Sequence, residues 1–123
     1  MSFIRKVSKT VATDAAGDAT AYSDVFTGRI SQIRYVKDSY DNGVDFTITV
    51  DGTGENVWVE SNVNASATRA PRQATHDTVG AASLYAAAGE PVEDKIAVAH
   101  DRLKIVIAQG GNVKSGTFHV LVE

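Results

Sequence analysis

The side chains best suited to metal binding or acid–base chemistry in this chain are three histidines, which lie far apart in the sequence. A metal site needs several ligands brought together at characteristic spacings. His76, His100 and His119 are not spaced four residues apart, and none is accompanied by carboxylates in a metal-ligand spacing. We therefore expect the histidines to lie on the surface or in ordinary hydrogen bonds rather than to bind metal.

Two stretches rich in Asp and Gly resemble ion-binding or phosphate-binding loops only superficially. Asp38, Asp41 and Asp45 surround an Asn-Gly pair, but an EF-hand requires ligands at alternate positions and a glutamate at the twelfth. The stretch Asp51–Glu55 lacks the lysine and hydroxyl residue that end a phosphate-binding loop. Both compositions are typical of turns. The sequence predicts turns here, with no bound metal or cofactor.

Nucleophilic catalysis also lacks its usual components. His76 and Asp77 are adjacent, and neighbours in sequence do not readily orient each other as the histidine and aspartate of a serine triad do. The chain has no Gly-x-Ser-x-Gly motif and no cysteine. We expect the protein not to be an enzyme.

Two arginines flank a proline in the stretch from Arg69 to Arg72. Pro71 fixes its own φ and disfavours helix at the residue before it, so the two guanidinium groups are held on a stiff, extended segment. Arginine binds carboxylates through two parallel hydrogen bonds, which suits such a segment to a partner protein. An ordinary solvated loop is the alternative. We predict that Arg69, Pro71 and Arg72 contact a partner.

The composition is that of a small globular protein. Apolar residues make up 43% of the 123 residues and charged residues 22%, with a net charge of −3. A weakly acidic chain has no electrostatic drive towards nucleic acid, and no apolar run approaches the length of a membrane span. The first residues lack the apolar stretch of a signal peptide. We expect a single domain, residues 1–123, made in the cytoplasm, with no nucleic-acid or membrane partner.

Hydrophobic alternation predicts an all-β fold. The clearest run is Val44–Val50, in which Phe46, Ile48 and Val50 share one face. Short strands at such regular spacing are typical of an antiparallel β-sandwich or barrel, here jelly-roll-like with about eight strands. The candidate strands are residues 3–13, 20–27, 29–36, 44–50, 55–60, 95–99, 103–108 and 117–123.

The last two candidate strands are expected to form a β-hairpin that organises the sheet. Each alternates over its whole length, and the eight residues between them are rich in Gly and Asn. The second strand runs to the last residue, so it should hold the end of the chain in a sheet. The buried faces are predicted to carry Leu103, Ile105, Ile107, Phe118, Val120 and Val122.

The strand Arg29–Val36 alternates poorly, because its charged and apolar residues do not separate onto two faces. Such a pattern is expected for an edge strand or for one that meets another subunit. Arg34 and Tyr35 are therefore candidate partner contacts.

Trp58 is predicted to face outward, because Val57 and Val59 are assigned to the inner face of the strand 55–60. An exposed Trp is unfavourable in a monomer. We expect the long loop that follows, or a partner, to cover it.

Residues 61–93 show no period-two pattern and are rich in Ala, Thr, Ser and Asn. A long irregular segment in a small domain usually has a function. One short helix is predicted within it, over Val79–Ala88. Asp77 or Thr78 would cap its start, and Gly89, with a proline two residues further on, would end it. The segment is interpreted as an interaction arm that carries a short helix.

Five parts of the sequence carry a resemblance to known proteins: Arg34–Lys37, Gly43–Thr49, Asn62–Ala67 with Ala70–Arg72, Asp101–Gly111 and Ser115–His119. These segments resemble small proteins encoded among the virion structural genes of tailed bacteriophages and prophages. The similarity covers most of the chain from Asp14 onward and contains no catalytic motif.

The resemblance implies a virion component, and a capsid decoration (cement) protein fits a disulfide-free β scaffold with surface arms. Its partners would then be the major capsid protein and itself, as a homotrimer at three-fold positions of the capsid surface. A tail-tube, head–tail joining or fibre-base protein is the first alternative. A carbohydrate-binding β-sandwich with Trp58 as a sugar platform is the second.

Overall fold

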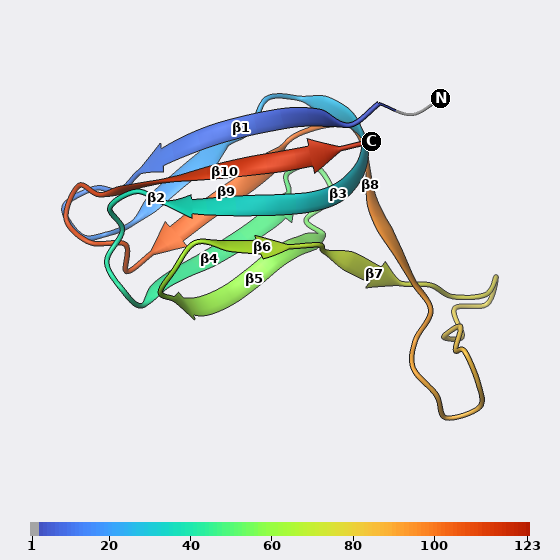
Figure 1. Cartoon of the computed structure of the whole chain (residues 1–123). Helices are drawn as coiled ribbons and strands as arrows, with labels where there is room; N and C mark the ends of the chain where they lie inside the picture. Colours follow the sequence, from blue (N-terminus) through green and yellow to red (C-terminus); the bar gives the residue numbers. More distant parts are fainter. Residues whose placement is uncertain (1–2) are drawn as a thin grey trace.

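The computed structural model describes residues 3–123, and these form ten β-strands in two antiparallel sheets packed as a β-sandwich (Figure 1). The larger sheet has six strands in the order β1-β10-β3-β8-β7, with β6 also paired to β3. The smaller sheet has four, in the order β2-β9-β4-β5. The strands are β1 (Arg5–Ala12), β2 (Ala19–Tyr22), β3 (Phe26–Lys37), β4 (Val44–Val50), β5 (Asn56–Val63), β6 (Ala67–Arg69), β7 (Arg72–Ala74), β8 (Glu93–Asp101), β9 (Leu103–Ala108) and β10 (Ser115–Val122).

The strands pair from the two ends of the chain inward. When the three-residue strands β6 and β7 are set aside, eight strands remain, and the first pairs with the last. The second then pairs with the seventh, the third with the sixth and the fourth with the fifth, as β1·β10, β2·β9, β3·β8 and β4·β5. The chain therefore behaves as one long antiparallel hairpin wrapped around a common core.

An aromatic cluster lies at the centre of that core. Tyr35 and Phe118, from the larger sheet, meet Phe46 and Trp58, from the smaller one, with ring centroids 4.7 to 6.3 Å apart. Stacked and edge-to-face rings at these distances add to the stability that their burial supplies. The remaining core is aliphatic and comes from both sheets. The two sheets are therefore joined at their centre by packed aromatic side chains.

The predicted all-β sandwich and the alternation of its best strands are confirmed. The β4 residues Phe46, Ile48 and Val50 are all buried, as are Ile96 and Val98 of β8. The inner faces of β9 and β10 carry the six aliphatic and aromatic residues predicted for them, each at most 2% exposed. Strand β10 is paired on both sides, so the end of the chain is held within the larger sheet.

The predicted C-terminal hairpin is wrong. Strand β9 lies in the smaller sheet between β2 and β4, and β10 lies in the larger sheet between β1 and β3. The connection between them crosses from one sheet to the other and packs against the turn after β1, where the Gly110 amide donates to the Gly17 carbonyl at 2.9 Å. A Cβ on Gly17 would lie 2.9 Å from the Gly111 nitrogen, so this close approach requires glycine.

Strand β3 is not an edge strand, so one of the two expectations for it is wrong. It pairs with β10 on one side and with β8 and β6 on the other. Its alternation fails because the register with β10 shifts between Gln32 and Ile30, which leaves Ser31 as an extra residue. Such a β-bulge resets which side chains face inward, so Ile30 and Ile33 are both fully buried although three residues apart.

Trp58 faces inward, also contrary to prediction, and again a bulge is the reason. In β5, Trp58 pairs with Ile48 and Asn56 pairs with Thr49, so Val57 has no partner of its own. Val57 and Trp58 are consequently both buried, while Val59 is 57% exposed. The single tryptophan is a core residue of this chain and needs no partner to cover it.

The predicted helix over residues 79–88 is absent. Residues 75–92 instead form two successive turns, and Gly80 and Ala88 have positive φ angles that no α-helix contains. Asp77 was expected to cap the helix and instead closes the first turn. The segment has no apolar stripe that packs on the core, so it lacks the burial that usually stabilises a short helix. Among residues 3–123 no helix has the length and hydropathy needed to cross a membrane.

Candidate functional site

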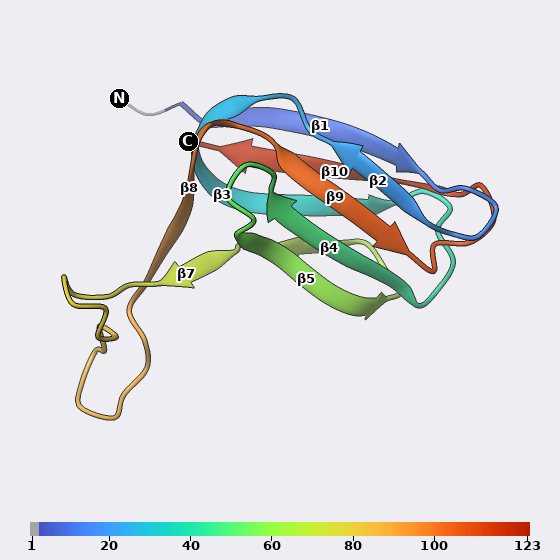
Figure 2. The same ribbon diagram turned by 180° about the vertical axis from the view of Figure 1, so that it is seen from behind.

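The most prominent surface feature is an arm, residues 72–95, which projects from one end of the sandwich (Figures 1 and 2). Its base is the pairing of β7 with the first residues of β8, from Arg72 opposite Lys95 to Ala74 opposite Glu93. Because β8 continues from the arm into the larger sheet beside β3, the sheet itself sets the direction of the arm. The arm is therefore an extension of the fold.

Backbone hydrogen bonds hold the arm in one shape although it has no core. The Thr75 amide donates to the Val92 carbonyl, and the Ser83 amide donates to the Thr75 carbonyl, at 2.9 and 3.0 Å. In the first turn the Asp77 carboxylate accepts from the amides of Val79 and Ala81, both at 2.9 Å. These two hydrogen bonds hold the pKa of Asp77 below its usual value, and the bond from Ala81 has the larger effect. These hydrogen bonds therefore stabilise a single extended conformation of the arm.

The outer part of the arm exposes its largest apolar side chains. Val79 is 86% exposed, Tyr85 76% and Leu84 41%, and none of residues 72–95 is buried. Three consecutive alanines, residues 86–88, adjoin the tyrosine and are exposed as well. An ordered segment that leaves its aromatic and aliphatic groups in solvent is typical of a binding surface.

The arm is also acidic between Arg72 and Lys95, the two cations at its base. Residues 73–94 contain four carboxylates, those of Asp77, Glu90, Glu93 and Asp94, and no Lys or Arg. The formal charge of −3 for the chain therefore divides into −4 for residues 73–94 and +1 for all other residues. The carboxylates of Glu90 and Glu93 form no ion pair or hydrogen bond with any residue from 3 to 123. A partner for this surface should combine apolar and cationic groups.

Arg69, predicted to bind a partner, is bound within the chain. Its Nε and one terminal nitrogen donate to the two carboxylate oxygens of Glu60 at 2.8 and 2.9 Å. The same guanidinium carbon lies 5.6 Å from the centre of the Trp58 ring, and the Trp58 indole N–H donates to Glu60 at 3.0 Å. The three side chains join β5 to β6 where the two sheets meet. This is a structural role.

The other predicted contact residues have different positions. Arg72 donates to the Ser31 and Pro71 carbonyls, at 3.1 and 2.8 Å, at the base of the arm. Arg34 is exposed on β3 and donates to Thr68 at 3.2 Å. Tyr35 is fully buried, so the expectation that it contacts a partner directly is wrong. Of the predicted set, Arg34 presents its cationic group at the surface of the larger sheet.

The three histidines lie in separate places. His76 is exposed in the arm, His100 lies at the end of β8, and His119 lies on β10 with its Nδ1 2.7 Å from the Ser8 hydroxyl oxygen. Residues 3–123 contain no group of three or more His, Cys, Asp or Glu side chains arranged to hold a metal ion. Asp38, Asp41 and Asp45 fall in and around the β3–β4 connection, where Asp45 accepts from the Asn62 amide at 3.0 Å.

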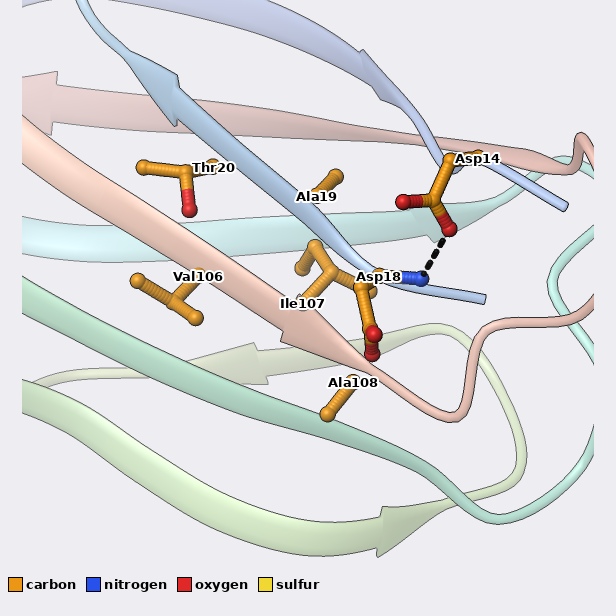
Figure 3. Close-up of a pocket in the computed structure, with 7 residues that line it drawn as sticks. All are labelled: Asp14, Asp18, Ala19, Thr20, Val106, Ile107 and Ala108. Carbon is orange, nitrogen blue, oxygen red and sulfur yellow. Dashed lines mark hydrogen bonds between the residues drawn. The ribbon is translucent and has the colours of Figure 1, made fainter. Parts of the chain in front are cut away.

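A shallow pocket of about 270 Å³ lies between the start of β2 and the end of β9 (Figure 3). Its two carboxylates are those of Asp14 and Asp18, and Asp14 accepts from the Ala16 and Asp18 amides at 2.9 and 3.0 Å. The remaining lining consists of Ala, Val, Ile and one Thr. The hydrogen bonds give Asp14 the role of a turn-former.

The functional candidates that sequence reasoning missed are the arm residues Val79, Leu84 and Tyr85, which were assigned to a helix. A signal was present, because residues 73–94 contain four carboxylates and no Lys or Arg. No protein-family profile, curated protein or solved structure matches the chain.

Proposed function

We propose that the protein is a structural component of a tailed-bacteriophage virion, and specifically a decoration protein that binds the major capsid protein on the outside of the shell. The observation that carries the proposal is the ordered arm, which leaves Val79, Leu84 and Tyr85 in solvent. A rigid body with one projecting extension that exposes apolar side chains suits a protein that bridges neighbouring subunits. The resemblance of several sequence segments to phage structural proteins also supports the proposal.

The strand order supports a jelly roll. The eight longer strands pair first with last and second with seventh, which is the wrapped-hairpin arrangement of that fold. Jelly rolls are frequent in viral capsid proteins and also in lectins, so the fold alone assigns no function. It does provide a stable scaffold without disulfides, since the chain has no cysteine.

Decoration would stabilise a shell by mass action. A protein that binds the expanded shell and not the separate capsid subunits shifts the equilibrium towards the assembled state. Because a shell offers many equivalent positions, each contact can be weak.

The test is binding of the purified protein to expanded heads assembled from the major capsid protein encoded in the same genome. We expect co-sedimentation with the heads, regularly placed density on their outer surface in electron micrographs, and a higher disruption temperature of the decorated heads. Heads that stay bare at saturating protein would overturn the proposal.

The matched variant replaces residues 75–92 by Asn-Gly. Ala74 and Glu93 are directly paired, so a two-residue turn can join them and keep the sandwich intact. We expect this variant to unfold at the same temperature as the native chain and to leave the heads undecorated. If it decorates heads as well as the native chain does, the arm is not the attachment site.

The other virion positions differ in the assembly that they require. A tail-tube or head–tail joining protein would form rings and bind at the vertex or tail instead of across the shell, and the same micrographs distinguish these sites. The carbohydrate-binding alternative has lost its supporting observation, because Trp58 is 5% exposed and cannot serve as a surface platform.

A further inference from the structure

The face of the larger sheet that points away from the smaller sheet is uncovered; it is called the outer face here. Register places Lys6, Leu121 and Gln32 in one row across β1, β10 and β3. The next row contains Ser8, His119, Arg34 and Thr68, ending on β6. These side chains alternate with buried residues such as Val120 and Ile33, so they point to solvent.

The outer face has the opposite charge to the arm. Lys6 and Arg34 are its central charged groups, and no carboxylate occurs in either of the two rows. The nearest acids lie at the margins, where Glu123 pairs with Lys95 and Asp38 accepts from Thr117. Leu121 is partly exposed within the rows, and Ile4, just before β1, is 63% exposed. The face therefore combines cationic and apolar groups.

The arm cannot reach the outer face of its own chain. Its base is fixed by the pairing of β7 with β8, and β8 continues beside β3. From there the arm leads away from the sandwich in both views (Figures 1 and 2). Any contact between an arm and an outer face is therefore made between two molecules.

We infer that the arm of one copy of the protein binds the outer face of the larger sheet of a second copy. Glu90 and Glu93 of the arm meet Lys6 and Arg34 of the neighbour, and Tyr85, Leu84 and Val79 cover its apolar groups. Opposite charges on the two surfaces select this pairing and disfavour arm against arm or face against face. The same three side chains carry the proposed attachment to the shell, so one arm makes one of these contacts at a time: it binds either a capsid subunit or a neighbouring copy.

The contact joins two different surfaces, so every copy both gives an arm and receives one. Such head-to-tail contacts close into a ring when the rotation between copies permits and otherwise continue as a chain. They also weaken as salt is added, because the charged groups lie at the surface.

Sedimentation of the full-length protein tests the inference with three variants. Glu90→Lys with Glu93→Lys reverses the charge of these two arm positions. Lys6→Glu with Arg34→Glu reverses the charge of the outer face, and the third variant carries all four changes. We expect the native chain to self-associate, each double variant to dissociate with a dissociation constant at least about ten-fold higher, and the four-residue variant to associate again. At a concentration low enough for all four proteins to be monomeric, they should share one unfolding temperature, since these side chains are exposed.

Carbodiimide cross-linking supplies a second measurement. In a mixture of isotope-labelled and unlabelled protein, we expect a cross-link between Lys6 of one copy and Glu90 or Glu93 of another. A native chain that stays monomeric at high concentration would overturn the inference, as would self-association that is unchanged by either reversal. If the monomer still decorates heads through its arm, the arm binds a shell subunit, and the proposed function stands without this contact.

Discussion

Arg69 donates two hydrogen bonds to the carboxylate of Glu60, at 2.8 and 2.9 Å, across the junction of β6 and β5. The pair joins β5 of the smaller sheet to β6 of the larger one, and the Arg69 guanidinium lies over the Trp58 ring. An arginine that the sequence alone presents as a free binding group is therefore occupied within its own chain. The exposed side chains of the arm remain as the candidates for binding a partner.

Replacing Arg69 should lower stability rather than binding. We expect Arg69→Ala to reduce the free energy of unfolding by about 1 kcal/mol, since the ion pair is partly solvent-exposed and the contact with the Trp58 ring adds modestly. Denaturant titration measures the change. Arg34→Ala, which removes one 3.2 Å hydrogen bond at the surface, should change stability by less than about 0.5 kcal/mol. Equal losses in the two variants would contradict the structural role of Arg69.

The contribution of this ion pair should disappear in acid. Hydrogen bonding from Arg69, and to a lesser degree from Trp58, holds the pKa of Glu60 below its ordinary value of 4.5. A carboxylate with a depressed pKa in the folded state stabilises the fold above its unfolded value, and this stabilisation is lost as the pH falls through the folded value. The difference in unfolding free energy between the native chain and Arg69→Ala should therefore be constant near neutrality and shrink below 4.5. A difference that grows in acid would show that other carboxylates dominate.

Two neighbouring tyrosines should respond in opposite ways to loss of their hydroxyl groups. The Tyr40 hydroxyl donates to the Val11 carbonyl at 2.6 Å, whereas the buried Tyr35 hydroxyl has no partner among residues 3–123. A buried polar group without a partner destabilises the fold, so Tyr35→Phe should leave stability unchanged or raise it by up to about 1 kcal/mol. Tyr40→Phe should lower it by about 1–2 kcal/mol. Thermal unfolding compares the two variants directly, and a larger loss for Tyr35→Phe would contradict the hydrogen-bond assignment.

The same tyrosines should make the fold sensitive to alkali. Burial, helped by Asp38, raises the pKa of Tyr35 from 10.0 to about 12, and burial raises that of Tyr40 as well. Because the fold disfavours both tyrosinates, its stability should be unaffected by these groups below 10 and should fall as the pH rises from 10 towards 12. Unfolding free energies measured across this window should decline less for Tyr35→Phe than for the native chain. Parallel declines would mean that folding does not raise the pKa of Tyr35.

Side-chain direction was predictable wherever a strand is regular. In β4, β9 and β10, alternation places every second residue in the core, and the structure agrees along their whole length. The same reasoning fails in β3 and β5, because each strand contains a bulge. The extra residue, Ser31 in β3 or Val57 in β5, reverses which of the following side chains point into the core. No local feature of the sequence marks these positions.

Strand pairing was less predictable than strand location. Strands β9 and β10 are close in sequence and alternate well, yet each pairs with strands from the other half of the chain. Such partners are chosen by the packing of the whole core rather than by neighbouring residues. The missing helix in the arm has a related cause. Asp77 and Gly89 are suitable capping residues, but a helix between them would have no apolar face packed on the core to stabilise it.

The emission of Trp58 should report a buried ring. It is the only tryptophan in the chain, is 5% exposed, and lies edge-to-face with Phe46 and Phe118. We expect a blue-shifted emission maximum, weak quenching by iodide, and no change when glycans are added. Trp58→Ala should destabilise the fold by about 3–5 kcal/mol. Strong iodide quenching in the native chain would place the ring at the surface and restore the sugar-platform alternative.

The exposed apolar groups of the arm should matter for association and not for folding. Val79→Ser with Tyr85→Ser changes two side chains that are 86% and 76% exposed, so the free energy of unfolding should shift by less than about 0.5 kcal/mol. Exposed aromatic anchors supply much of the energy of a protein interface, so self-association and attachment to heads should weaken at least about ten-fold. Val113→Ser is the matched control, because Val113 is 68% exposed in the β9–β10 connection, at the opposite end of the sandwich. Sedimentation of all three proteins measures the effect. If the control weakens binding as much as the arm variant does, the loss reflects a general change in surface hydrophobicity, and the arm is not the specific contact.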